Sequence, residues 1–516
     1  MYSKLYSGLA LGIDGMLVTV ESDVSVGMPG LFMVGYLASS VKEAGERVRT
    51  ALKNVGYSFP SKRITVNLSP ADVRKEGSGF DLAIAVSILI SMGDIPINQS
   101  FNKKLSETLF LGELGLDGEV LSVPGVLPIV DHAAAQGIKR VILPRKNAVE
   151  AAYIKDIDII PVENLIDVIC MLGQNGFFES FKSPEMSFAV KDGFEFDLAD
   201  IRGQEMMKRG VIIAVSGFHN ILLTGAAGSG KSMVAKCIPE LMPPLSYEES
   251  LELTKIYSIA GMLDLSEGLI RERPFRSPGQ NVSEAALIGG GRNPKPGEIT
   301  LATGGVLFLD EFPEFQRSVI EGLRQPMEDR KVTVSRVKAS YTFPARFMLV
   351  SARNNCPCGF YPDRKRCRCS ATEIYHYQNK ISHPIMDRID IRLEIKPVGY
   401  NELFGKAEGL SSADAKQMIE VARERQESRY KNESFRFNSE IPQGRIEDYI
   451  KLGNEETELM RRVYESSEIS ARGYYKVLRL ARTIADIDDR EEINVRDIEE
   501  ATFFRNESDG VYIPEV

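Results

Sequence analysis

The stretch Gly225–Ser232 has the residue types and spacing of a loop that binds phosphate groups. It reads Gly-Ala-Ala-Gly-Ser-Gly-Lys-Ser and fits the pattern GxxxxGK[ST]. The apolar run Ile221–Leu223 precedes it and Met233–Ala235 follows it, which predicts a strand, a glycine-rich turn and the start of a helix. Glycines let backbone N–H groups surround a polyphosphate, and a helix N-terminus adds favourable partial positive charge. We therefore predict that this chain binds a nucleoside triphosphate.

Two residues of this loop have distinct expected roles. Lys231 would reach the β- and γ-phosphates, and Ser232 would ligate Mg²⁺. The expected cofactors are therefore ATP and Mg²⁺. The expected phosphate-loop residues are Gly225, Ala226, Ala227, Gly228, Ser229, Gly230, Lys231 and Ser232.

Two further apolar runs end in polar side chains that suit phosphate chemistry. Val306–Leu309 predicts a buried strand, after which Asp310 would hold Mg²⁺ and Glu311 would polarise the attacking water as general base. Asp-Glu is also common at ordinary strand ends, but its position downstream of a phosphate loop favours the catalytic interpretation. A third strand, Phe347–Val350, leads to Asn354, whose amide could orient water against the γ-phosphate or simply cap a turn.

The composition is that of an ordinary soluble globular protein. The chain has 516 residues, 43% hydrophobic and 26% charged, which suits roughly three domains. Its best apolar run, Ile84–Ile90, is far shorter than a membrane helix, and the N-terminus lacks the apolar core of a signal peptide. We therefore expect a cytoplasmic protein with no membrane partner. A net charge of −9 argues against a globally basic nucleic-acid binder, although a basic channel inside an acidic assembly is compatible with it.

The residue pattern divides the chain into three parts. Residues 1–180 alternate short strands and helices, residues 190–397 form a second α/β unit, and residues 400–510 are helical and rich in charge. A plausible linker runs over Gly173–Asp192. The clearest expected strands are Leu17–Glu21, Ile64–Asn67, Leu109–Leu111 and Val141–Leu143, and the clearest helices are Ser40–Val55, Phe80–Met92, Ala413–Tyr430 and Ala471–Asp486.

A series of motifs, taken in order along the chain, resembles the magnesium-chelatase-like AAA+ ATPases and most closely their ComM/YifB branch. The resemblance covers nearly the whole chain. It implies an α/β protein with an N-terminal Lon-protease-like α+β domain, an AAA+ P-loop α/β core and a C-terminal α-helical lid. The motifs are Gly203–Glu205, the phosphate loop, Arg273–Pro278, Gly289–Gly291, Pro296–Glu298, Leu307–Phe312, Asp387–Asp390 and Ser470–Arg472.

The same resemblance implies roles that the residues alone would not assign, because surface arginines are usually just solvated. It implies a ring, a homo-hexamer, with ATP at the subunit boundaries. Arg388 matches the family's arginine finger, which reaches into the neighbouring site, and Arg472 matches its sensor-2 arginine on the helical lid. Asn354 matches the sensor-1 position.

Two elements resemble insertions that face the pore in ring motors of this clade. They are Arg271–Gly291 and the hairpin Val332–Lys338, where Arg336 and Lys338 could contact a phosphate backbone or could protect a solvated hairpin edge. Where relatives typically have Ser-Pro-His-His-Thr, this chain has Gly279 and Gln280 in place of the two histidines. Two metal-capable side chains are therefore missing from the first insertion.

Four of the six cysteines, Cys356, Cys358, Cys367 and Cys369, lie within fourteen residues. Four thiolates in a hydrophilic loop favour a structural, tetrahedral Zn²⁺ over free or redox thiols and over disulfides. Relatives carry the same CPCG…CxC arrangement, which supports the positions without fixing the metal. Neighbouring Arg364, Lys365, Arg366 and Arg368 make this loop locally basic.

The N-terminal part lacks the serine–lysine dyad of a Lon protease. Those proteases carry the serine four residues after the lysine of their motif, and the segment Lys75–Gly79 places glycine there, with Ser78 offset by one residue. The second motif of those proteases contains the catalytic lysine. In this chain the matching segment, Pro124–Leu127, has a leucine at that position. Without a nucleophile and a base within reach we expect no proteolysis, and we interpret the domain as a binding or ring-organising module.

The leading functional hypothesis is an ATP-hydrolysing ring motor on DNA, a helicase or translocase for branch migration of recombination intermediates. This is what the resemblance implies, with single-stranded or branched DNA as partner. The alternative is a chelatase-like remodelling ATPase that acts on a protein or inserts metal. A nucleotide-switched scaffold without catalysis is disfavoured, because Lys231, Asp310, Glu311 and Arg388 are all present.

Overall fold

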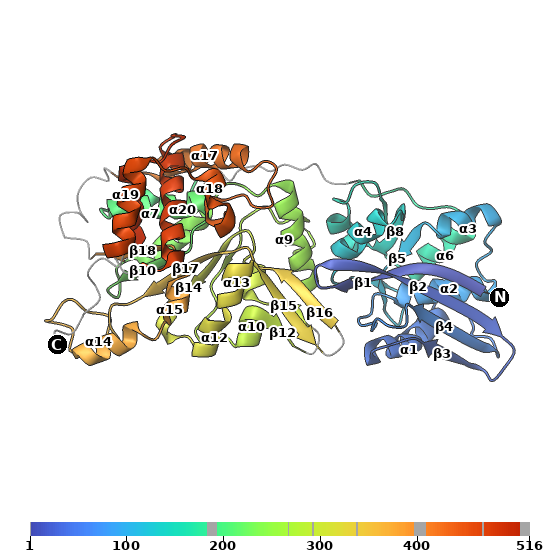
Figure 1. The fold of residues 1–516 in the computed structure, drawn as a ribbon. Coiled ribbons are helices and arrows are strands. Elements are labelled where there is room, and N and C mark those ends of the chain that lie inside the picture. Colours follow the sequence, from blue (N-terminus) through green and yellow to red (C-terminus); the bar gives the residue numbers. More distant parts are fainter. Residues whose placement is uncertain are drawn as a thin grey trace.

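The computed structural model describes residues 2–182, 193–266, 268–291, 294–336, 339–396, 409–466 and 469–505. It is a mixed α/β protein with an N-terminal region built on a mixed sheet, a central parallel sheet and a helical C-terminal region (Figure 1). Within these residues no helix is both long enough and apolar enough to cross a lipid bilayer.

The N-terminal part is built on a seven-stranded mixed sheet in the order β3-β4-β2-β1-β5-β8-β9. Strands β1, β2 and β4 pair antiparallel, whereas β5, β8 and β9 continue in parallel from β1. The strands are β1 (Tyr2–Leu11), β2 (Asp14–Ser25), β3 (Gly30–Val34), β4 (Arg63–Ser69), β5 (Thr108–Phe110), β8 (Arg140–Pro144) and β9 (Asp158–Val162), with a separate short pair β6 (Glu113–Leu114) and β7 (Val120–Leu121).

Helices cover both faces of this sheet. On α1 the buried residues recur at helical spacing, whereas every residue of α2 from Asp81 to Ser91 is buried, because α2 lies inside the domain core. The helices are α1 (Ser39–Asn54), α2 (Asp81–Met92), α3 (Gln99–Leu105), α4 (Val126–Ala135), α5 (Ala148–Ala151) and α6 (Leu165–Gly173).

The central part contains a five-stranded, all-parallel sheet in the order β11-β14-β17-β10-β18. Alternate residues of β10 face opposite sides: Ile221 and Leu223 join the core shared with the C-terminal helices, and Leu222 joins the core on the other face. The strands are β10 (Ile221–Gly225), β11 (Phe275–Arg276), β14 (Val306–Leu309), β17 (Met348–Arg353) and β18 (Ile391–Ile395).

The remaining central elements are helices around this sheet and two small hairpins. The helices are α7 (Glu205–Gly217), α8 (Lys231–Leu241), α9 (Tyr247–Ala260), α10 (Glu284–Ile288), α11 (Glu298–Leu301), α12 (Arg317–Gly322), α13 (Arg324–Asp329), α14 (Ala371–Gln378) and α15 (His383–Met386). The hairpins are β12 (Gly289–Gly290) with β13 (Lys295–Pro296), and β15 (Lys331–Arg336) with β16 (Ala339–Pro344).

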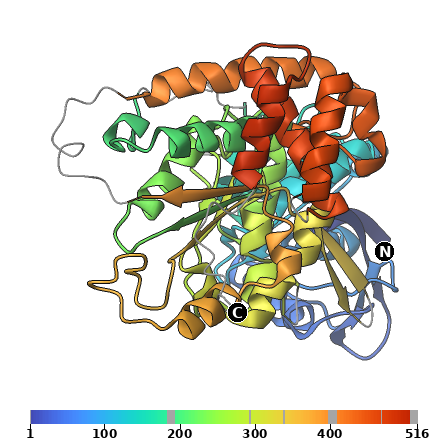
Figure 2. The ribbon, with the colours of Figure 1, turned by 60° about the vertical axis from the view of Figure 1, so that its left-hand side comes forward.

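The C-terminal helices pack on α7 and on one face of the central sheet (Figure 2). Ser411 caps the first of them, and Asp414 closes a capping box with it. The helices are α17 (Ser412–Arg429), α18 (Ile446–Tyr449), α19 (Asn454–Ser466), α20 (Ala471–Ile487) and α21 (Val495–Arg505).

Helix α9 joins the N-terminal part to the central part. Ser258 Oγ donates to Oε2 of the buried Glu150 at 2.7 Å, and Tyr247 OH donates to the Tyr153 carbonyl at 2.7 Å. Burial raises the pKa of Glu150, although hydrogen bonds from its neighbours oppose the rise. The two halves therefore meet through a defined polar joint along one helix (Figure 1).

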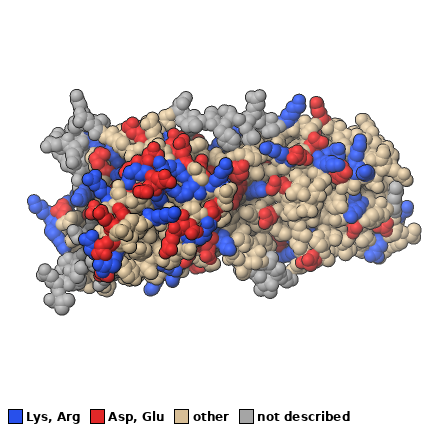
Figure 3. All heavy atoms as spheres, turned by 45° about the horizontal axis from the view of Figure 1, so that its top comes forward, with Lys and Arg blue, Asp and Glu red and all other residues tan. Residues whose placement is uncertain are grey.

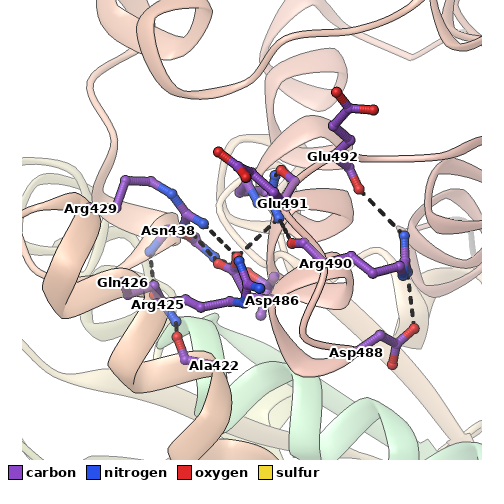
Figure 4. A network of polar contacts seen from close by, with 12 residues as sticks. Ala422, Arg425, Gln426, Arg429, Asn438, Asp486, Asp488, Arg490, Glu491 and Glu492 are labelled. Carbon is purple, nitrogen blue, oxygen red and sulfur yellow. Dashed lines mark hydrogen bonds and ion pairs between the residues drawn. The ribbon is translucent and has the colours of Figure 1, made fainter.

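A buried charge network holds the C-terminal helices together (Figure 4). Asp486 on α20 is fully buried and accepts two hydrogen bonds from Arg429 at 2.6 and 2.8 Å. Arg482 adds an ion pair to Asp486 at 3.0 Å, and Asn438 Nδ2 donates to it at 2.8 Å. Removing this carboxylate would leave two arginines without their charge partner in a desolvated site.

We predict that Asp486→Ala destabilises the C-terminal helices by about 3–5 kcal/mol, the cost of breaking a buried pair from one side. The midpoint of urea unfolding measures this. The control is Glu465→Gln, which breaks an exposed pair with Arg461 on α19 and should leave the midpoint unchanged. Equal midpoints for the two variants would contradict the importance of the buried network.

Candidate nucleotide site

The phosphate loop lies between the end of β10 and the start of α8. Gly228 and Gly230 have φ values of 78° and 92°, a region in which side chains other than glycine are strained. Lys231 is the first residue of α8, so the loop amides and the helix N-terminus face the same space. The local structure is the strand, turn and helix that the sequence predicts.

A cavity of about 350 Å³ adjoins this loop. Three parallel neighbours, β14, β17 and β10, end at the same edge of the sheet and bring residues distant in sequence to this cavity. Its lining residues are Ala227, Gly228, Ser229, Gly230, Lys231, Ser232, Met233, Asp310, Glu311 and Asn354. The structure thus brings together the loop, both carboxylates and the amide that the sequence singled out.

Lys231 is 8% exposed and is held at the base of the cavity. Its ammonium group donates to the Gly225 carbonyl at 2.9 Å and the Ala226 carbonyl at 2.8 Å, and to Asn354 Oδ1 at 3.0 Å. Burial lowers the pKa of Lys231, and the negative charges of Asp310 and Glu311 oppose that shift. A triphosphate would supply the full negative charge that this buried cation lacks.

The expected Mg²⁺ ligands are already adjacent. Ser232 Oγ donates to Asp310 Oδ2 at 2.9 Å, which places a hydroxyl and a carboxylate oxygen side by side. Oxygen ligands of this kind suit Mg²⁺, which usually takes one or two protein groups together with phosphate and water. The donor set therefore fits the metal.

Glu311 is held in an uncommon backbone conformation beside Asp310. Its φ of 51° is left-handed, and its backbone N–H donates to Asp310 Oδ1 at 2.9 Å. Gln280 Nε2 also donates to the Glu311 carboxylate. Sequence reasoning noted Gln280 only as a replacement for a histidine, and nothing in the sequence indicated that it reaches the expected general base.

Arg388 and Arg472 are not among the residues that line this cavity. Arg388 lies just before β18, beside Asn220 at the start of β10, and Asn220 Nδ2 donates to its carbonyl at 3.3 Å. The phosphate loop follows the other end of β10, about 13 Å further along the strand. Arg472 lies at the start of α20. Both Arg472 and Arg388 donate hydrogen bonds to the carboxylate of Glu328.

The four clustered cysteines converge into one group. Their sulfur atoms all lie within 4.8 Å of one another, with Cys356 Sγ 3.3 Å from that of Cys358 and 3.7 Å from that of Cys367. Sulfurs about 3.8 Å apart would surround Zn²⁺ at its usual bond length of about 2.3 Å. The Tyr361 N–H also points at Cys356 Sγ, 3.4 Å away, as amides near thiolate ligands do. The donor set fits a tetrahedral metal.

The cysteine loop touches the phosphate loop. The Ala227 N–H donates to the Gly359 carbonyl at 2.9 Å. Gly359 has a φ of 79°, and a Cβ there would come 2.9 Å from the Ala227 Cβ, so the close approach requires glycine. Cys356 is also only two residues beyond Asn354. Sequence reasoning did not foresee that the cysteine group and the nucleotide pocket adjoin.

Two residues, Arg336 and Lys338, are the expected nucleic-acid contacts. Arg336 is the last residue of β15, and Lys338 lies outside the described residues. On the face shown in Figure 3, acidic and basic side chains are interspersed over the central and C-terminal parts instead of forming one basic stripe. The residues compared with the Lon-protease motif lie in the N-terminal part. The Lys75 ammonium donates to the Val73 carbonyl at 2.9 Å, and Ser78 Oγ donates to Glu113.

Comparisons with known proteins agree with this architecture. Family models match residues 20–147 (subunit ChlI of Mg-chelatase), 197–403 (magnesium chelatase, subunit ChlI) and 409–505 (magnesium chelatase, subunit ChlI C-terminal). The chain is 38% identical to "Uncharacterized protein YifB" of Escherichia coli K12 over 505 residues, 98% of this chain and 97% of that one. It is also 38% identical over 507 residues to "Competence protein ComM" of Haemophilus influenzae, 97% of each chain.

The chain belongs to the ComM/YifB family of magnesium-chelatase-like AAA+ ATPases. A more distant similarity, 25% identity over 206 residues and 39% of this chain, links it to the archaeal Lon protease of Pyrococcus abyssi. ATP and Mg²⁺ are the cofactors of an AAA+ ATPase. For this family member, the pocket geometry described above indicates which side chains would hold them.

We predict that Lys231→Ala weakens nucleotide binding about 10- to 100-fold, because hydrogen bonds to a charged partner contribute about 1.5–3 kcal/mol. Glu311→Gln should bind nucleotide normally and lose about 10²- to 10⁴-fold in turnover, the usual contribution of a general base. Fluorescent-nucleotide titration and steady-state phosphate release separate the two effects. Normal binding by Lys231→Ala would remove the phosphate-loop assignment.

Proposed function

We propose that this AAA+ ATPase is a hexameric ring motor that moves DNA, a helicase or translocase for branch migration of recombination intermediates. The single observation that supports a ring is the separation of Arg388 from the pocket of its own subunit. Arg388 lies at the amino edge of the parallel sheet, and the phosphate loop lies at its carboxyl edge. A second subunit would supply the arginine that the pocket lacks, so that hydrolysis is completed between subunits.

Each pocket residue then has one role. Lys231 neutralises the β- and γ-phosphates, Ser232 and Asp310 hold Mg²⁺, and Glu311 takes the proton of the attacking water. Asn354 accepts a hydrogen bond from Lys231 and would orient that water. Bound Mg²⁺ would neutralise charge on the phosphate oxygens. Arg388 and Arg472 would act on the triphosphate of the neighbouring subunit.

The DNA assignment depends on family membership. The Haemophilus influenzae relative is named a competence protein. Arg336 and Lys338 are the proposed phosphate-backbone contacts, and a ring would bring six such hairpins together. Backbone contacts by lysine and arginine are independent of sequence and are weakened by salt. The net charge of −9 gives this assignment no support of its own.

We further propose that Cys356, Cys358, Cys367 and Cys369 hold a structural Zn²⁺ in the reducing cytoplasm, where the protein works. Four sulfur ligands leave no open position for catalysis. The metal would fix the loop whose Gly359 carbonyl bonds to the phosphate loop.

Branched DNA should stimulate the ATPase several-fold more than single-stranded or duplex DNA. The measurement is steady-state phosphate release with each DNA at low and raised salt, and stimulation should fall as salt rises. Lys231→Ala, which cannot turn over, is the control for contaminating ATPases. Absence of stimulation by every DNA would favour the alternative, a chelatase-like ATPase that remodels a protein or inserts metal.

We expect about one zinc ion per chain in protein purified under reducing conditions, measured by atomic emission. The double variant Cys358→Ser/Cys369→Ser should lose it, and Cys170→Ser, which changes a separate cysteine, should keep it. Loss of zinc should also weaken nucleotide binding severalfold, because the Gly359 contact loses its support. Reduced protein that is fully folded and free of zinc would refute the metal site.

A further inference from the structure

One carboxylate joins the two arginines that lie away from the pocket. Glu328, near the end of α13, accepts a hydrogen bond from Arg472 Nη2 on Oε1 at 3.0 Å. Its other oxygen, Oε2, pairs with Arg388 Nη2. The two arginines come from different parts of the chain: Arg388 lies beside the central sheet, and Arg472 begins a C-terminal helix.

Arg388 is held more firmly than Arg472. Its Nε donates to the Arg324 carbonyl at 3.1 Å and its Nη1 to the Pro384 carbonyl at 2.8 Å, so all three guanidinium nitrogens have partners. Its side chain is 13% exposed, whereas those of Glu328 and Arg472 are about half exposed, at 50% and 53%. Arg472 thus depends more on the shared carboxylate for its orientation.

The C-terminal helices also clamp the backbone around Arg388. Lys476 on α20 pairs with Asp390 at 2.6 Å, and Arg505 on α21 pairs with Asp387 at 3.4 Å. Asp390 in turn accepts the Asn220 N–H at 2.9 Å, which ties the segment to β10. The position of the C-terminal helices is therefore coupled to the position of Arg388.

Two guanidinium groups repel each other unless an anion lies between them. A half-exposed ion pair changes an equilibrium by at most about fivefold, whereas an arginine finger changes turnover by about 10³- to 10⁵-fold. Glu328 is therefore too weak to hold the arginines back from a triphosphate. Glu328 is instead positioned to keep the two guanidinium groups side by side, so that both could bind one phosphate group of a neighbouring subunit.

We propose that Glu328 is a positioning residue that presents Arg388 and Arg472 as a pair to the nucleotide of the next subunit. This rests on the cross-subunit ATPase proposed above. The group that the two arginines would bind is the terminal phosphate of a nucleoside triphosphate. Its oxygens would replace the Glu328 carboxylate as the hydrogen-bond acceptors of both arginines. Glu328 itself is not among the residues that line the pocket of its own subunit.

The first test compares Glu328→Gln, which keeps the shape and removes the charge, with Asp329→Asn. Asp329 is the next residue, is exposed, and accepts from Gln325, so it is a matched control. Glu328→Gln should lower kcat about two- to fivefold, the range of a half-exposed ion pair, and leave KM for ATP and the assembled mass unchanged, whereas Asp329→Asn should behave as wild type. Glu328→Asp, which keeps the charge, should recover part of the loss. Wild-type kcat in Glu328→Gln would overturn the inference.

The second test mixes variant subunits. Lys231→Ala subunits have no working pocket but carry intact arginines, so they should restore turnover when mixed with Arg388→Ala subunits, whose pockets are intact. Mixing with Lys231→Ala subunits should likewise restore the turnover of Glu328→Gln subunits. Rescue of Arg388→Ala without rescue of Glu328→Gln would overturn this inference alone. Failure to rescue either variant would overturn the cross-subunit ATPase, and this inference with it.

Discussion

The parallel pairing of the four neighbouring strands β14, β17, β10 and β18 is the constraint on which the rest of this structure depends. Because the chain runs in one direction through these strands, everything that follows them gathers at one edge of the sheet and everything that precedes them gathers at the other. The phosphate loop, the carboxylates and Asn354 belong to the first group, and Arg388 belongs to the second. In the proposed function, one subunit thus contributes one set of groups for binding a triphosphate and a separate set for acting on the triphosphate of its neighbour.

The two edges of the sheet are connected through the packing of its hydrophobic cores. Residues of β10 alternate between two hydrophobic cores, one of which also includes the C-terminal helices. A shift of those helices would move Lys476 and Arg505, which clamp the segment around Arg388, while Lys231 and Asn354 stay bonded to each other. Such an arrangement allows the arginines to respond to the helices without dismantling the pocket.

The fold class and the family could be predicted from the sequence, because strand and helix periodicities are local and the motifs are dense. The prediction placed Phe347–Val350 in a strand, and β17 extends to Arg353, because pairing with β10 continues through Thr224. Contacts between distant residues that belong to no shared motif could not be predicted. Glu328 is 60 residues from Arg388 and 144 from Arg472, and Gly359 meets Ala227 only through the packing of two loops. Neither a periodicity nor a motif encodes such a meeting.

The joint along α9 gives the molecule an elongated outline, with the N-terminal part extending to one side (Figure 1). An elongated particle has more friction with solvent than a sphere of equal mass, and its Stokes radius is correspondingly larger. Elution volume on a gel-filtration column calibrated with compact proteins would therefore overstate the mass of a single chain. Counting the subunits of any assembly calls for a method independent of shape, such as sedimentation equilibrium.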